Sequence, residues 1–412
     1  MAGMTCDVCQ GKVVASAKEG WFVCEYCDTE YPLEWMKAKF QKTQNIKVDG
    51  PVEVKSVDFD IRAGVLVKYN GAATEAIVPE GVVEIGDGAF QDCKGLITVH
   101  IPWGVTMIGL QAFSNCIALK KITLPESCLG AKGSAFEGCI NLQIVEIQAE
   151  EIGGFGPQCF KGCESLIEIK LPKTLALYDS VFQDCVSLKT VALENVVQTL
   201  GSDIFQNCSA LETVAYPKNF SSIGTVFRGC TGLKRFVLPE GMTEIPAQAF
   251  ANCSSLETIT LYEGIQTIQQ GAFMKCDSLT TINFPSTLKV IQTQAFHNCK
   301  SLRELVFPKG LEQIGPDAFS SCKSLRRIYI PTITSRLLIG DGAFIFCTSL
   351  TDVIYENTQG IQVFPATFQS TPYEAKKKQR QEWHEAGRCD HCGGELSLFG
   401  NKCKTCGKKN LY

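Results

Sequence analysis

One short pattern recurs along this chain and limits what it can fold into. A Phe stands three residues before a Cys and six residues before a Leu twelve times, from Phe90 to Phe344, and the steps are 22 to 25 residues long. A period this regular is typical of stacked repeats, in which each repeat buries its apolar face against its neighbours. We therefore predict one elongated array with small end modules.

The full repeat predicts a coil that contains a short strand. It reads AF-x2-C-x2-L-x2-I-x-L-P-x2-V-x2-IG-x2-AF, as in the coil that begins at Ala112. Side chains alternate along a strand, so Leu119, Ile122 and Leu124 should face the core. The Pro that follows has no backbone N–H and ends strand pairing. Parallel stacking should place equivalent outward residues in columns, such as Val306, Tyr329 and Ile354.

Cysteine accounts for 22 residues, which fall into three groups. Twelve form the column between the recurring Phe and Leu, and we interpret them as packing residues, because equivalent side chains of parallel coils do not converge as a disulfide requires. Cys128 and Cys159 occupy apolar positions of the repeat. The remaining eight form CxxC pairs, and none of the 22 is a candidate nucleophile.

The CxxC pairs predict two four-cysteine zinc ribbons. Each pair places two thiolates on one tight turn, and two turns complete a tetrahedral site. The predicted ligands at the two ends of the chain are Cys6, Cys9, Cys24 and Cys27, and Cys389, Cys392, Cys403 and Cys406. Disulfides or a redox-active CxxC are the alternatives, but neither an export signal nor a thioredoxin-like pattern accompanies the pairs.

Composition and charge favour a cytoplasmic protein with protein partners. The net charge of −4 gives no electrostatic footprint for nucleic acid, and no apolar run approaches the roughly 18 residues of a membrane span. Unpaired thiols indicate a reducing compartment. The four histidines, His100, His297, His384 and His391, form no metal or triad pattern, and no small-molecule site is expected.

The repeat in residues 249–261, AFANCSSLETITL, resembles the BspA-type leucine-rich repeats of bacterial proteins. The resemblance implies a β-rich, right-handed leucine-rich-repeat solenoid of about 12 to 13 coils with short parallel strands and a role in protein contacts. Some members of that family are described as surface adhesins. The flanking CxxC pairs resemble the zinc ribbons attached to many cytoplasmic bacterial proteins.

Five segments are expected along the chain. They are a zinc ribbon with a short helix after Pro32 (1–45), a β-rich cap with a hairpin turn at Asn70-Gly71 (46–76), the solenoid (77–371), a charged helical linker (372–388) and the second ribbon (389–412). Strands are expected between Ile46 and Val57.

We expect a non-catalytic protein-interaction scaffold with two structural zinc ions. Near the C-terminal end the sequence places Arg303, Lys323, Arg326, Arg327 and Tyr329 on adjacent coils, and Arg and Tyr are favoured interface residues. Two alternatives remain: a nucleic-acid-associated protein that uses the ribbons and Lys376 to Arg380, and a surface adhesin. An unrecognised enzyme is a third.

Overall fold

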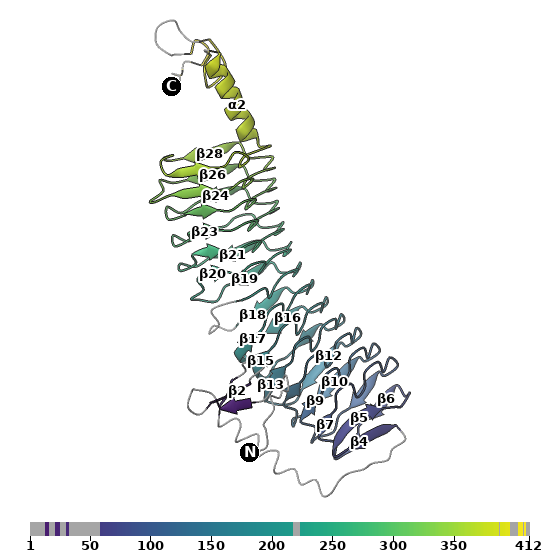
Figure 1. Ribbon diagram of the computed structural model, residues 1–412. Coiled ribbons are helices and arrows are strands. Elements are labelled where there is room, and N and C mark those ends of the chain that lie inside the picture. The colour runs from purple at the N-terminus through teal and green to yellow at the C-terminus, as the bar shows by residue number, and fades with distance from the viewer. Residues whose placement is uncertain are drawn as a thin grey trace. The chain divides into compact units, whose positions relative to one another are not determined.

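The structure is a computed structural model that describes residues 58–216, 223–386, 388–395, 403–406 and 408, apart from the side chains of residues 197 and 198. Of residues 13–15, 21–24 and 30–32 only the backbone is described. The chain divides into two compact units, Met1–Glu240 with Asn252–Ser254, and Gly241–Ala251 with Ser255–Tyr412. Both units contain a stack of short coils (Figure 1).

The first strands form a small antiparallel sheet. Its order is β1 (Val13–Ala15), β2 (Trp21–Cys24) and β3 (Glu30–Pro32). The helix expected after Pro32 and the strands expected between Ile46 and Val57 lie outside the described residues.

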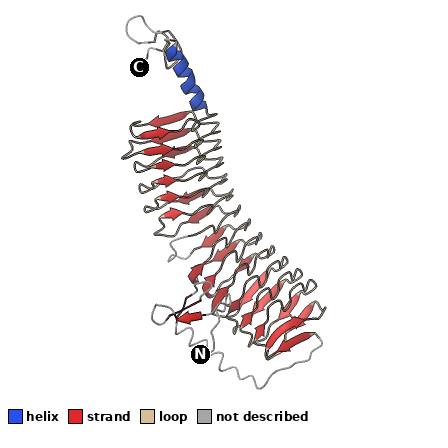
Figure 2. Ribbon diagram, in the orientation of Figure 1, coloured by secondary structure: helices blue, strands red, loops and turns tan. Residues whose placement is uncertain are grey.

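Successive coils of the first unit contribute two short strands each, which belong to different parallel sheets (Figure 2). One set of strands comprises β6 (Glu75–Ile77), β8 (Thr98–His100), β10 (Lys121–Leu124) and β12 (Ile144–Ile147), then β14 (Glu168–Ile169), β16 (Thr190–Ala192), β18 (Thr213–Ala215) and β19 (Arg235–Val237). The other begins with β4 (Phe59–Arg62) and continues with β5 (Val65–Tyr69), β7 (Glu84–Ile85), β9 (Met107–Ile108), β11 (Gly130–Ala131), β13 (Glu151–Phe155), β15 (Lys173–Leu177) and β17 (Val196–Leu200).

The second unit repeats this arrangement. One sheet contains β20 (Glu244–Ile245), β22 (Thr267–Ile268), β23 (Val290–Ile291), β25 (Gln313–Ile314), β27 (Leu337–Ile339) and β29 (Ile361–Val363). The other strands are β21 (Thr258–Thr260) and the sheet β24 (Glu304–Val306), β26 (Arg327–Ile330) and β28 (Asp352–Tyr355). The predicted strand is present in most coils, whereas the second strand of each coil was not predicted.

The recurring Phe side chains form a ladder in the core. The rings of Phe90 and Phe113 lie 4.8 Å apart and within 9° of parallel, and those of Phe296 and Phe319 lie 5.0 Å apart and within 1°. All four rings are fully buried. Burial of such a side chain contributes about 1.5–3 kcal/mol, and only a neighbouring coil can provide it. The predicted leucine-rich-repeat architecture is confirmed.

The Cys column also lies in the core, beside this ladder. From Cys116 to Cys347, eleven thiols each donate a hydrogen bond of 3.0–3.3 Å to the carbonyl oxygen of the Phe in the preceding coil. These eleven cysteines form no disulfide and are buried, whereas Cys93 is only half-buried. The prediction of packing residues rather than disulfides is therefore confirmed.

The residue before each Cys of the column has a left-handed backbone. Its φ lies between 59° and 78° in all twelve repeats. Asn, Asp or Gly, which tolerate this conformation best, occupy nine of these positions. Lys275, Ser321 and Phe346 occupy the other three and carry the associated strain.

The predicted hairpin turn at Asn70-Gly71 is wrong. Strands β4 and β5 form the hairpin, and its turn is at Ala63 and Gly64, whose φ angles are 48° and 79°. Gly71 instead allows the Tyr69 ring to lie against the backbone, because a Cβ at Gly71 would be 2.3 Å from Tyr69 Oη. The Tyr69 ring lies 5.0 Å from the Phe90 ring, so Tyr69 extends the ladder at its first end.

The coils end at Thr371, which takes the position of the Cys and begins helix α2 (Pro372–Glu385). Thr371 Oγ1 accepts a hydrogen bond of 3.1 Å from the Glu374 N–H, and Pro372 occupies the first turn. This is a helix start of the Thr-x-x-Glu type. Within the described part of the chain, no helix combines the length and apolar character that a membrane span requires.

Candidate metal centre and binding surface

The C-terminal cysteines gather at one point directly after helix α2. Arg388 N–H donates to Trp383 O at 2.6 Å, which connects the end of the helix to the first CxxC turn. Gly393, which follows Cys392, has a left-handed φ of 68°, and a Cβ there would lie 2.6 Å from the Trp383 ring. Glycine is therefore required at this turn.

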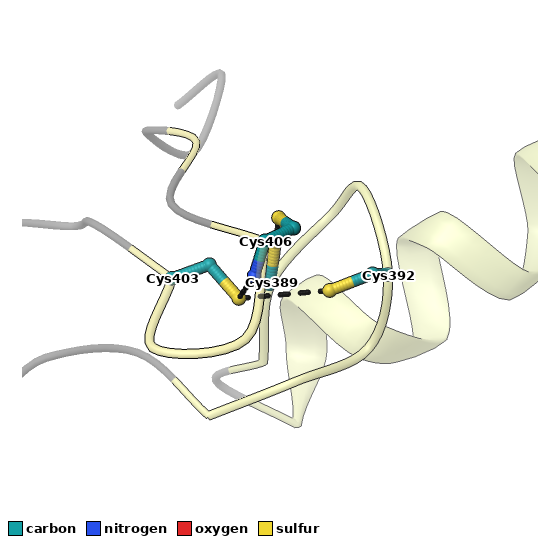
Figure 3. Close-up of side chains that lie close together, drawn as sticks. All are labelled: Cys389, Cys392, Cys403 and Cys406. Atoms are coloured by element: carbon teal, nitrogen blue, oxygen red, sulfur yellow. Dashed lines mark hydrogen bonds between the residues drawn. The ribbon is translucent and has the colours of Figure 1, made fainter.

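The four sulfurs have the spacing of a tetrahedral ligand set (Figure 3). All of them lie within 4.8 Å of one another. Cys392 and Cys403 lie 3.5 Å apart, and Cys389 and Cys406 lie 3.7 Å apart. Four thiolates that bind one zinc ion at about 2.3 Å lie about 3.8 Å apart. Cys389, Cys392, Cys403 and Cys406 could therefore hold a metal ion.

Backbone amides stabilise negative charge on one of these sulfurs. The N–H groups of Cys406 and Thr405 donate to Cys403 Sγ at 3.4 and 3.3 Å. These hydrogen bonds, that of Cys406 first, lower the pKa of Cys403 to about 6. The thiolate is the form of cysteine that binds metals. His391, which lies between Cys389 and Cys392, donates its backbone N–H to Cys389 Sγ at 3.4 Å.

The N-terminal ligand set cannot be placed in the same way. Cys6, Cys9 and Cys27 lie outside the described residues, and of Cys24 only the backbone in β2 is described. The second metal site therefore stays a prediction from the CxxC spacing.

The predicted contact residues lie on the sheet β24-β26-β28 or in the turns that precede its strands. Arg303, Lys323, Arg326 and Arg327 are exposed, and Tyr329 is half-buried. Arg327 pairs in register with Glu304 and Asp352, and Tyr329 pairs with Val306 and Ile354. The predicted columns are thus present on this sheet.

These two columns differ in character. In the apolar column, Val306 is 61% exposed and Ile354 is 43% exposed, with Tyr329 between them. In the charged column, the Arg327 guanidinium lies 3.5 Å from a Glu304 carboxylate oxygen. Aromatic residues and Arg are enriched at protein interfaces, and Tyr329 and Arg327 stand in these two columns.

A cleft lies between the end of this sheet and helix α2. Its volume is about 560 Å³, and it was not predicted from the sequence. Thr351 and residues 352–354 of β28 form one wall, and the other is formed by residues of α2, namely Tyr373, Lys376, Lys377, Arg380, Gln381 and His384. Asp390 also lines the cleft. A cleft at the junction of two elements is a common place for a binding site.

A search among known families gives one decisive match. The family described as BspA type leucine rich repeat region matches residues 68–177, 153–280 and 266–372, which together make up most of the chain. The chain belongs to the BspA-type leucine-rich repeat family. The match ends at residue 372 and does not reach the cysteines at either end of this BspA-type protein.

Several solved structures are similar to this BspA-type chain. A leucine rich cell surface protein from Faecalibacterium prausnitzii is 25% identical with a TM-score of 0.49, and the alignment covers 76% of this chain and 96% of that chain. A leucine-rich repeat protein from Bacteroides ovatus is 21% identical with a TM-score of 0.47, with 89% and 100% covered. No curated protein matches.

Proposed function

We propose that this protein is a non-catalytic protein-interaction scaffold of the cytoplasm, and that its contact surface includes the outward face of the sheet β24-β26-β28. The observation that carries the proposal is the exposed apolar column Val306, Tyr329 and Ile354 beside the charged column Glu304, Arg327 and Asp352. Scattered exposed apolar residues are ordinary on a protein surface, whereas aligned ones with Arg and Tyr beside them favour a partner.

The proposal also holds that the protein has no catalytic activity. His100 Nε2 lies 2.7 Å from the Glu75 carboxylate on an exposed surface, and His384 Nδ1 lies 3.2 Å from the Asp390 carboxylate. The eleven column thiols from Cys116 to Cys347 are buried, and the thiols nearest Asp390 in the chain, Cys389 and Cys392, belong to the four-cysteine set, so we assign a nucleophile to neither pair. These pairs support a structural role for the histidines.

The test of the contact surface compares captured proteins. The immobilised full chain should retain partners from a lysate of the source cells, and Arg327→Glu combined with Tyr329→Ala should lose them. The control is Arg235→Glu combined with Val237→Ala on β19, which changes an exposed Arg and the apolar residue two positions after it on another strand. Equal capture by both variants would place the contact surface elsewhere.

The zinc ions are proposed for structural roles at both ends. The sulfur spacing supports the C-terminal ion, and the CxxC spacing supports the N-terminal ion. Metal analysis of the purified protein should return two zinc ions per chain. Cys389→Ser with Cys403→Ser should leave one, and so should Cys6→Ser with Cys24→Ser. An intact chain without zinc would contradict both sites.

Localisation distinguishes the proposal from a surface adhesin. Twelve repeat thiols and two CxxC sets fit a reducing compartment, so protease added to intact cells should leave the protein uncut. Cleavage on intact cells would favour the adhesin.

A further inference from the structure

The last full coil supplies the final strand of both sheets of the second unit. Strand β29 pairs with β27 at the end of one sheet, and β28 pairs with β26 at the end of the other. The chain that could have supplied the next strand forms helix α2 instead (Figure 1). In the described chain, β28 therefore has a strand partner on one edge only.

Alternate backbone groups of β28 face this open edge. The N–H groups of Asp352 and Glu356 donate to carbonyls of Arg326 and Ile330 in the neighbouring coil. Because consecutive residues of a strand point their N–H and C=O groups to opposite edges, those of Val353 and Tyr355 face away from β26. Residues 351–354 also line the cleft, so the open edge borders a space of about 560 Å³.

The opposite wall of the cleft is positively charged. Lys376, Lys377 and Arg380 line it and form no ion pair with any acid of the described residues. The acids at the cleft are Asp352, on the strand, and Asp390, which lies beside His384. Lys376, Lys377 and Arg380 thus outnumber the two carboxylates of the cleft, and one of these, Asp390, already lies beside His384. The cleft therefore favours an anionic occupant.

We propose that this cleft binds an extended acidic peptide segment of a partner protein, which adds as a strand to the open edge of β28. The backbone groups at Val353 and Tyr355 would pair with the peptide, and its carboxylates would lie against Lys376, Lys377 and Arg380. This inference rests on the proposed function and names the chemistry of the partner. Proteins usually cover an open strand edge or protect it with charged residues. The alternative to the proposal is therefore that α2 only covers the edge of β28.

The first experiment selects ligands from random peptides displayed on phage, with the full chain as bait. The selected peptides should be rich in Asp and Glu and poor in Pro. A selected peptide with a fluorescent label should bind about tenfold more weakly to Lys376→Glu combined with Arg380→Glu. The control is Lys378→Glu, since Lys378 lies on the same helix, pairs with Glu374 at 3.2 Å and does not line the cleft. Equal binding by all three proteins would overturn the proposal.

A second measurement tests strand addition itself. An added strand pairs through alternate residues only, so N-methylation of the peptide backbone in one alternating phase should abolish binding, and methylation in the other phase should be tolerated. Bound peptide should also slow amide exchange in residues 352–355. Equal tolerance of both phases would exclude binding by strand addition. Full competition by a single-stranded oligonucleotide would identify nucleic acid, and not a peptide, as the ligand.

These results separate the two proposals. Loss of protein capture by the Arg327 and Tyr329 variant, with no acidic peptide selected, would overturn the inference about the cleft and leave the proposed function standing. Failure of both experiments would remove the proposed function as well.

Discussion

The thiol of Cys116 donates a hydrogen bond of 3.0 Å to the carbonyl oxygen of Phe90, which also accepts the Cys93 N–H at 3.1 Å. One carbonyl therefore joins its own coil to the next. The donor must be small enough to fit between the Phe and Leu columns and must remain protonated. Both conditions make the Cys column a source of stability with a defined dependence on pH.

The folded chain should lose stability in alkaline solution. Burial raises the pKa of Cys128 and Cys139 from 9.0 to about 12, and it also raises the pKa of Cys163, Cys208 and Cys230 well above 9.0. The folded chain holds these protons more tightly than the unfolded chain. The contribution is therefore complete below pH 9 and is lost as the pH rises toward 12, by about 1.4 kcal/mol per thiol and pH unit.

Urea unfolding under reducing conditions at pH 7.5, 9 and 10 would measure this loss. The control is Cys128→Val combined with Cys139→Ala, which should show a smaller decrease between pH 9 and 10. A midpoint that does not change up to pH 10 would contradict the explanation.

Thiol alkylation should divide the cysteines into two classes. In the native protein at pH 8 the buried column should not react with iodoacetamide, because burial keeps the thiols out of reach of the reagent. Cys392 and Cys406 are exposed and, if the proposed zinc ion is bound there, should react only after a chelator has removed it. Mass spectrometry of tryptic peptides would locate the label. Alkylation of Cys208 or Cys299 without unfolding would be the opposite result.

Two glycines of the first unit should differ in their tolerance of alanine. A Cβ at Gly154 would lie 2.0 Å from the Ala176 carbonyl oxygen, and its φ of 139° is one that other residues rarely adopt. Gly154→Ala should therefore destabilise the fold by about 3 kcal/mol. A Cβ at Gly95 would meet nothing within 4 Å, so Gly95→Ala is the control and should have little effect. Thermal unfolding would measure both.

The repeats were largely predictable because their signal is long and regular. The Phe ladder, the Cys column and the inward residues Leu119, Ile122 and Leu124 follow from periodicity and burial alone. The second strand of each coil was missed because most of its copies contain only two or three residues, as in Glu84–Ile85. The hairpin was misplaced because Gly71 serves the Tyr69 ring rather than a turn.

Other features needed three-dimensional information. The left-handed position before each Cys was visible as a column of Asn, Asp and Gly, and that signal was not used. The cleft could not be predicted, since it depends on the direction in which α2 leaves the last coil. The spacing of the C-terminal cysteines, in contrast, predicted a set of sulfurs that the fold brings together.

Lys275 offers a stabilising substitution. Its φ is 60°, and the equivalent position holds Asn115, Asn207 and Asn298 in other coils. Lys275→Asn should raise the free energy of unfolding by about 1 kcal/mol, because Asn adopts this conformation more readily. Lys275→Ala is the control, since Ala has no such preference and should give no gain. Chemical denaturation of the three proteins would decide, and equal stabilities would show that strain at this position is negligible.

The start of helix α2 should depend on one hydroxyl group. Thr371→Val keeps the shape of the side chain but removes the acceptor of the Glu374 N–H, at a cost of about 1 kcal/mol. Amide exchange in residues 374–377 should become faster, while exchange in β26 should not change. Thr371→Ser should preserve slow exchange. Unchanged exchange in the Val variant would show that Tyr373, whose ring lies 5.2 Å from that of Phe368, holds the helix by itself.

The hydrogen bonds between coils also bear on how the array acquires its length. Each Phe carbonyl presents to the following coil the same acceptor that its own coil received, so a coil duplicated within the gene would find both neighbours already complementary. The contacts of such a coil do not depend on the number of coils that precede it. Thr371 ends the series because it caps a helix where every earlier coil has a thiol. The number of coils can thus change by duplication or deletion upstream, while the terminus that carries the helix and the cysteines is inherited intact.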